Sequence, residues 1–157
     1  MSITEELAKI LAHVNRPGDF YTMGRIELLA PRIEVEGVGQ ISLPLLVAQA
    51  QQLIKVATRA PYGRGVETVI DTKVRRTWQI EASRVAIGGK HWAQTLSSVV
   101  ARSVEGLGVT GPVIALLYKL LIYDKGSFFV SHRDTEKVPG MFATLVLALP
   151  SQSEGGE

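Results

Sequence analysis

The chain has 157 residues, of which 46% are hydrophobic, so it has the size of one ordinary domain and can bury a core. Its 17 lysine and arginine residues against 15 aspartate and glutamate residues leave a formal net charge of +2, which gives no electrostatic reason to expect nucleic acid as a partner. It contains no cysteine, which excludes disulfide bonds and zinc–thiolate sites and fits a reducing compartment.

The N-terminal residues do not resemble a signal peptide. Glu5 and Glu6 stand in a helical pattern, where a signal peptide has a basic and then an apolar region. The longest apolar run, residues 113–123, is interrupted by Lys119 and is far shorter than the roughly 20 residues that cross a bilayer. We therefore expect a soluble, cytoplasmic protein without a membrane partner.

Three segments have the periodicity of helices. Ser2 followed by Glu5 has the spacing of a capping box, and apolar residues then recur at helical intervals up to Pro17. A second helix is expected over 42–60, with its first residue as the N-cap, and a third over 92–104. Short strands are expected between them. The expected strands cover residues 26–29, 33–36, 66–70 and 77–80.

The character of the chain changes after residue 112. Residues 113–123 and 141–149 are almost continuously apolar and bracket a short segment, 128–130. Such runs are typical of strands that are buried on both faces. Helices followed by a buried sheet predict an α+β fold in a single domain, with only the tail 151–157 loose.

His132 and Asp134 are the candidate chemical site. In an extended chain, residues i and i+2 project to the same face, so this imidazole and this carboxylate can converge on one ion. Two histidines and one carboxylate form the facial triad of non-haem Fe(II) oxygenases. The alternative is a surface hydrogen-bonded pair in a charged turn, because Arg133, Glu136 and Lys137 are close in sequence.

The residues around this pair add a family resemblance. Tyr123, Gly126, Phe129, His132 and Asp134 reproduce a Tyr-x-x-Gly-x-x-aromatic-x-x-His-x-Asp stretch. This stretch resembles that of the prolyl 4-hydroxylase-like Fe(II)/2-oxoglutarate dioxygenases.

The resemblance extends beyond the motif. Residues 143–147 look like the strand that follows in the family, and 154–157 look like its Gly-Gly-Glu turn. The resemblance is strongest over 120–157, and weaker similarity to segments that precede the catalytic core is seen at 60–65 and 74–78.

The resemblance implies a double-stranded β-helix, or jelly-roll, core with helices packed outside it. It implies that His132 and Asp134 are the first two iron ligands and that Tyr123 lines the 2-oxoglutarate pocket, although Tyr123 can equally be a strand-end aromatic packed on the core. Phe128 and Phe129 are expected in the core, Phe129 where the family often has tyrosine. The implied cofactors are Fe(II) and 2-oxoglutarate, with ascorbate as an accessory reductant.

Two groups that the family uses are missing after Asp134. The family has a later histidine as third ligand and then an arginine or lysine that anchors 2-oxoglutarate, whereas this chain has no later histidine and only Lys137. His13 and His91 lie upstream, in the wrong order. We therefore expect residues 1–157 to contain an N-terminal region and the first, incomplete half of a dioxygenase domain that is inactive alone.

The full-length protein is accordingly expected to be a 2-oxoglutarate-dependent hydroxylase. Its substrate, a protein or peptide side chain or a small molecule, is not fixed by fold and metal ligands. The alternative is a non-catalytic dioxygenase-like interaction module. The unpaired edges of half a jelly roll also predict a homodimer. Lys73, Arg75 and Arg76 are read as a solvated face, with no nucleic-acid role.

Overall fold

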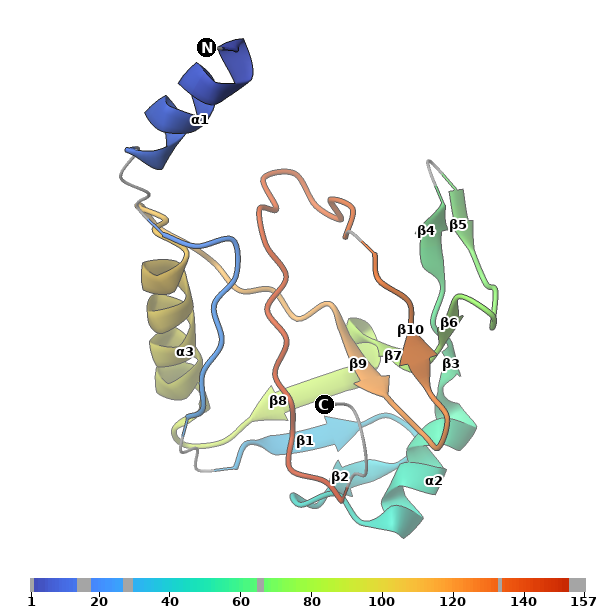
Figure 1. Ribbon diagram of the computed structural model, residues 1–157. Helices are drawn as coiled ribbons and strands as arrows, with labels where there is room; N and C mark the ends of the chain where they lie inside the picture. Colours follow the sequence, from blue (N-terminus) through green and yellow to red (C-terminus); the bar gives the residue numbers. More distant parts are fainter. Residues whose placement is uncertain (1, 14–17, 27–29, 65–66, 133, 153–157) are drawn as a thin grey trace. The chain divides into compact units, whose positions relative to one another are not determined.

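The computed structural model describes residues 2–13, 18–26, 30–64, 67–132 and 134–152, and it confirms a mixed α+β chain (Figure 1). Contacts divide the chain into two units, Met1–Leu29 with Ala93–Ala115 and Ala30–Trp92 with Leu116–Glu157. Within the described ranges, no helix is long and apolar enough to cross a membrane.

The first unit contains α1 (Ile3–Ala12) and nearly all of α3 (Trp92–Gly106). The predicted capping box is confirmed, because Ser2 Oγ accepts from Glu5 N and the Glu5 carboxylate accepts from Ser2 N. The apolar face of α1 is exposed, with Ile3 77% and Ile10 66% accessible. The third helix is also confirmed and has Val99 as its buried residue.

The second unit holds the strands, whose pairings are all antiparallel. One three-stranded sheet has the order β2 (Gly39–Ile41), β1 (Arg32–Val35), β8 (Val85–Gly88), and another has the order β3 (Thr58–Arg59), β7 (Trp78–Glu81), β9 (Lys119–Ile122). Two-stranded ladders join β4 (Tyr62–Arg64) to β5 (Glu67–Val69), and β6 (Arg75–Arg76) to β10 (Phe128–Phe129). The 3-10 turn Ala82–Arg84 joins β7 to β8.

A small aliphatic core holds this second unit together. The strict alternation of β1 places Ile33 and Val35 inside, each 1% exposed, as the sequence pattern predicts. Leu53 of α2 (Val47–Val56) packs into the same cluster with Ile80 and Ile122. Full burial of one such side chain is worth about 1.5–3 kcal/mol, so this cluster fixes α2 against the strands.

Two polar side chains of the β7 region are buried with the core. Thr77 is 0% and Gln79 is 6% exposed. Lys119 Nζ donates to Gln79 Oε1 over 2.6 Å, and Gln79 Nε2 donates to Glu81 Oε1 over 2.6 Å. Because a buried amide without partners is costly, this relay favours the observed register between β7 and β9.

The second helix begins later than the sequence predicts. It starts at Val47, whereas the periodicity places its N-cap at Ser42. The difference arises because Leu45 N donates to Pro150 O over 2.8 Å and Leu45 forms a parallel bridge with Ser151. Residue 151 is therefore held in place, contrary to the loose tail expected from residue 151 onward.

The two long apolar runs do not form the buried sheet that the sequence predicts. Within 113–123 only β9 is a strand, and 141–149 contains no strand. Many of their side chains are exposed, including Ile114 at 82% and Val146 at 77%. In the described part of the chain no neighbouring strand pairs with 113–118 or 141–149, so most of their side chains stay exposed, although Leu149 packs against the core.

Most of the other predicted strands are found in the structure. Strands at 33–36, 77–80 and 128–130 are confirmed within one or two residues by β1, β7 and β10. The strand predicted at 66–70 is confirmed over 67–69 by β5, and residue 66 lies outside the described residues. Residues 27–29, most of the strand predicted at 26–29, also lie outside them.

A tight turn between β9 and β10 is organised by Asp124. Ser127 Oγ donates to Asp124 Oδ1 over 2.6 Å and accepts from Asp124 N over 2.9 Å. Burial acts to raise the pKa of Asp124, but the Ser127 hydroxyl, the nearby indole N–H of Trp78 and the cations of Arg76 and Arg59 outweigh it and lower that pKa. Asp124 thus closes the turn through Ser127, and its charge is favoured by the cations of β6 and β3.

Asp124→Asn is expected to reduce the pH dependence of stability. The folded-state pKa lies below the unfolded value of about 3.9, so the charged form stabilises the fold above that pH, and the contribution is lost as pH falls through the folded pKa. Urea unfolding should show a steeper loss below about pH 4 for the wild type than for the variant, with the variant about 1 kcal/mol less stable at pH 7. Equal pH slopes for the two proteins would contradict this role.

Candidate metal centre

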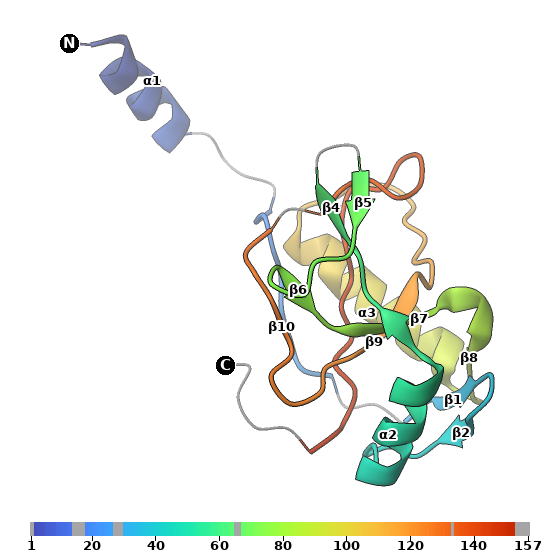
Figure 2. The same ribbon diagram turned by 90° about the vertical axis from the view of Figure 1, so that its right-hand side faces the viewer.

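The segment that carries His132 and Asp134 leaves the sheet at the end of β10. Phe129 pairs with Arg75 in the β6–β10 ladder, and Val130 N donates to Val74 O over 3.1 Å, which extends the pairing by one residue. Two views of the ribbon place β10 beside β6 (Figures 1 and 2). The loop therefore begins from a fixed backbone two residues before His132.

The imidazole of His132 is oriented by the backbone it has just left. His132 Nδ1 lies 2.9 Å from Val130 O. A carbonyl oxygen can only accept, so this contact places a proton on Nδ1 and leaves Nε2 of the neutral ring with a free lone pair. His132 Nε2 lies 3.6 Å from Asp134 Oδ1, which is too long for a hydrogen bond between them.

The carboxylate of Asp134 is oriented from a different part of the chain. Thr144 Oγ1 donates to Asp134 Oδ2 over 2.7 Å. This bond leaves Asp134 Oδ1 directed at His132. The Asp134 side chain is 49% exposed and the His132 side chain is 39% exposed. The pair is thus accessible from solvent, while each member is held on its outer side.

This donor set fits part of a divalent transition-metal site. Two donors on one ion at bond lengths of ~2.1 Å and right angles lie about 3 Å apart. The observed distance between His132 Nε2 and Asp134 Oδ1 is 3.6 Å, which is close to that separation. Histidine ligands usually donate their second N–H to a carbonyl, and carboxylate ligands usually accept a further hydrogen bond, as seen here. Among the described residues no group of three His, Cys, Asp or Glu forms.

Tyr123 is the third residue that the sequence assigns to the site. Within the described part of the chain, the hydrogen bonds and ring contacts of His132 and Asp134 run to Val130, Phe129 and Thr144, and none runs to Tyr123. Tyr123 is 56% exposed at the end of β9, so it is not packed in the core.

The upstream histidines and the only later lysine have local contacts. His13 Nδ1 lies 2.7 Å from Lys9 O at the end of α1, and His91 is exposed just before α3. Lys137 Nζ donates to Thr135 Oγ1 over 2.6 Å. Arg133 and the Gly-Gly-Glu segment 154–157 lie outside the described residues.

Three residues at or beside the centre were not assigned to it from the sequence. Thr144 was placed in a buried strand, and its only signal was a hydroxyl within an apolar run. Phe129 was expected in the core but stacks on His132, while Phe128 is 40% exposed. Arg75 was expected on a solvated face but is half-buried, with its Nη1 donating to Pro61 O over 2.9 Å.

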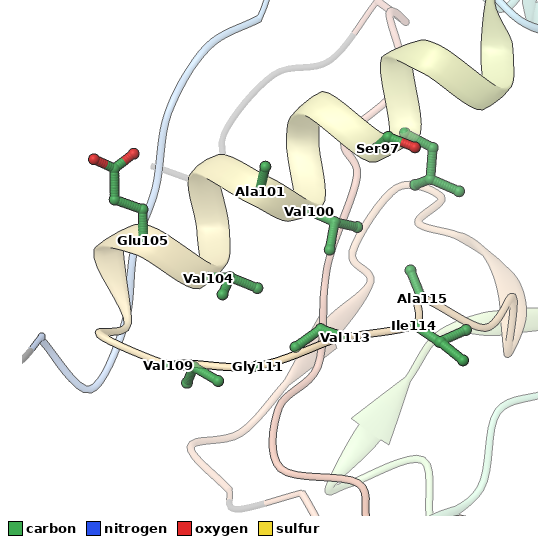
Figure 3. A pocket seen from close by; sticks show the side chains of 11 residues that line it. Ser97, Val100, Ala101, Val104, Glu105, Val109, Gly111, Val113, Ile114 and Ala115 are labelled. Atoms are coloured by element: carbon green, nitrogen blue, oxygen red, sulfur yellow. The ribbon is translucent and has the colours of Figure 1, made fainter.

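A separate apolar groove lies in the first unit, along α3 (Figure 3). Val100 and Val104 of α3 line it on one side, and Val113 and Ile114 of the following segment line it on the other. Among the described residues that line the groove, Glu105 is the only titratable one, so these residues offer no set of metal donors.

Comparison with known proteins adds no family to these observations: no family model, curated protein or solved structure matches the chain. The likeness to prolyl 4-hydroxylase-like enzymes therefore stays a prediction from the motif. The geometry around His132 and Asp134 is independent of that likeness.

Thr144→Val is expected to weaken divalent metal binding. Removal of the hydroxyl leaves the Asp134 carboxylate without its outer hydrogen bond, and loss of such a contact typically costs 10–100-fold in affinity. Isothermal titration with Co(II) should show a Kd about tenfold higher than that of the wild type. Thr144→Ser keeps the hydroxyl and should bind like the wild type, whereas equal binding by the valine variant would show that this bond does not orient the carboxylate.

Proposed function

We propose that this chain contributes the first two iron ligands of an Fe(II)- and 2-oxoglutarate-dependent dioxygenase. The supporting observation is the arrangement of His132 and Asp134, two residues apart, which face each other over 3.6 Å while Val130 O and Thr144 Oγ1 hold their outer atoms. The family motif from Tyr123 to Asp134 supplies the reaction class, because the pair alone fixes only a metal preference.

The roles of the chain's own residues follow from this geometry. Bound Fe(II), with 2-oxoglutarate as co-reductant and dioxygen as oxidant, would supply the chemistry that hydroxylates an unactivated carbon. His132 would hold the ion through Nε2 and Asp134 would hold it through Oδ1, and both side chains are accessible to solvent. Tyr123 is proposed to reach the 2-oxoglutarate pocket from the end of β9, where its side chain is exposed.

The proposal includes a jelly-roll core that these residues build only in part. Residues 113–118 and 141–149 are apolar and pair with no strand in the described part of the chain, as strands of such a core are before their neighbours are added. A third histidine ligand and a basic anchor have to come from outside residues 135–157, since that stretch holds no histidine and only Lys137 as a basic residue. Further sequence in the full-length protein is the proposed source.

A second candidate function is a non-catalytic, dioxygenase-like interaction module. The observation that favours it is the exposure of large apolar side chains on the unpaired segments, Leu116 at 68% and Phe142 at 55% among them. Such surfaces mark contacts with other chains. In this candidate a second copy or another protein covers the segments, and His132 and Asp134 form a surface pair.

Turnover distinguishes the two candidates. The longest protein encoded by the reading frame should convert 2-oxoglutarate to succinate in an Fe(II)-dependent reaction, and the 157-residue chain should not, because it lacks the third ligand and the anchor. In the longer protein, His132→Ala should remove succinate formation. His91 is an exposed histidine outside the centre, so His91→Ala should leave succinate formation unchanged. Absence of keto-acid binding and turnover in every form would favour the interaction module.

A further inference from the structure

The ring of Phe129 contacts two other planar groups. Its centroid lies 3.5 Å from that of the His132 imidazole, with the two planes inclined by 20°. The Arg75 guanidinium carbon lies 4.3 Å from the same Phe129 centroid. An imidazole and a guanidinium this close to one centroid would overlap if they shared a face, so Phe129 is sandwiched between Arg75 and His132.

Arg75 is fixed to the sheet at the far side of this sandwich. Its backbone pairs with Phe129 in the β6–β10 ladder, and its Nη1 donates to Pro61 O over 2.9 Å. Its Nε is buried and has no hydrogen-bond partner among the described residues. A buried N–H without an acceptor is unfavourable, so hydrogen bonding alone does not account for the position of this guanidinium, and contact with the Phe129 face does.

We propose that Arg75 and Phe129 are positioning residues for the His132 imidazole. This inference rests on the proposed role of His132 and Asp134 as metal ligands. Phe129 sets the plane of the imidazole, and Arg75 holds the Phe129 ring from its other face. This fixed orientation of the imidazole plane keeps the hydrogen bond between His132 Nδ1 and Val130 O, and it keeps His132 Nε2 directed at Asp134 Oδ1.

The need for such support follows from the exposure of the centre. His132 is 39% exposed, and its hydrogen bond runs to a carbonyl only two residues away, which by itself leaves the ring free to rotate into solvent. Stacking on a ring that belongs to the ladder removes this freedom. Both restraints on His132 therefore originate in the β6–β10 ladder, one through Val130 and one through Phe129.

The first test measures Co(II) binding by isothermal titration of the 157-residue chain, with Co(II) as an air-stable substitute for Fe(II). Phe129→Leu should raise the Kd about tenfold, as loss of an outer orienting contact does. Phe129→Tyr retains the stacking ring and should bind like the wild type. Phe128→Leu is the matched control, because Phe128 is the adjacent strand residue, is 40% exposed and does not stack on His132.

A second readout needs no metal. Imidazole nitrogen NMR shifts at pH 8 should show His132 as the Nδ1–H tautomer in the wild type and in Phe129→Tyr, and as a mixture of tautomers in Phe129→Leu. Arg75→Lys, which loses the planar guanidinium, should shift the tautomer mixture in the same direction, whereas Arg76→Lys should not. The Arg75 variant keeps the test decisive if the leucine variant does not fold.

Three outcomes bear on the inference. Weaker Co(II) binding and mixed His132 tautomers in Phe129→Leu, with wild-type Co(II) binding in Phe129→Tyr and Phe128→Leu, would support it. Equal Co(II) affinity and a single His132 tautomer in Phe129→Leu, Phe128→Leu and the wild type would overturn the positioning role while the metal pair stands. Co(II) binding that His132→Ala leaves unchanged would overturn the proposed metal pair, and the positioning role with it.

Discussion

The short antiparallel ladder between β6 and β10 is the constraint on which the candidate centre depends. It pairs Phe129 with Arg75, and the next residue, Val130, still donates its N–H to Val74 O. The Asp124 turn sets where β10 begins, because its carboxylate binds Ser127 and is stabilised by the cations of neighbouring strands. From this base the chain reaches His132 in two residues, so little backbone freedom separates the sheet from the imidazole.

The opposite side of the centre is held by a long-range contact. Thr144 lies ten residues after Asp134 and donates to its carboxylate, which connects the loop to the apolar segment 141–149. That segment forms no strand, and its end is fixed where Leu45 pairs with Pro150 and Ser151. His132 and Asp134 are therefore supported by different parts of the same unit, and their separation depends on both.

Local features of the sequence predicted the local features of the structure. The capping box at Ser2 and Glu5 and the alternation of Ile33 and Val35 need only neighbouring residues, and both are confirmed. The predicted start of α2 was wrong because the observed start depends on the pairing of Leu45 with Ser151, about a hundred positions later. The predicted burial of residues 113–118 and 141–149 was also wrong, because an apolar run does not specify a partner strand. For the centre, the His-x-Asp spacing predicted the facing pair, while Thr144 and Arg75 act across long sequence separations that no spacing encodes.

The most direct test of the metal pair is a Mn(II) titration of the isotope-labelled chain followed by NMR. Paramagnetic broadening falls off steeply with distance, so it locates the ion on the chain. The account predicts that the first resonances to broaden are those of residues 130–134 and Thr144, and that His132→Ala removes this selectivity. Broadening that begins at exposed acidic residues such as Glu5 and Glu34, and that is the same in His132→Ala, would contradict a metal centre at His132 and Asp134.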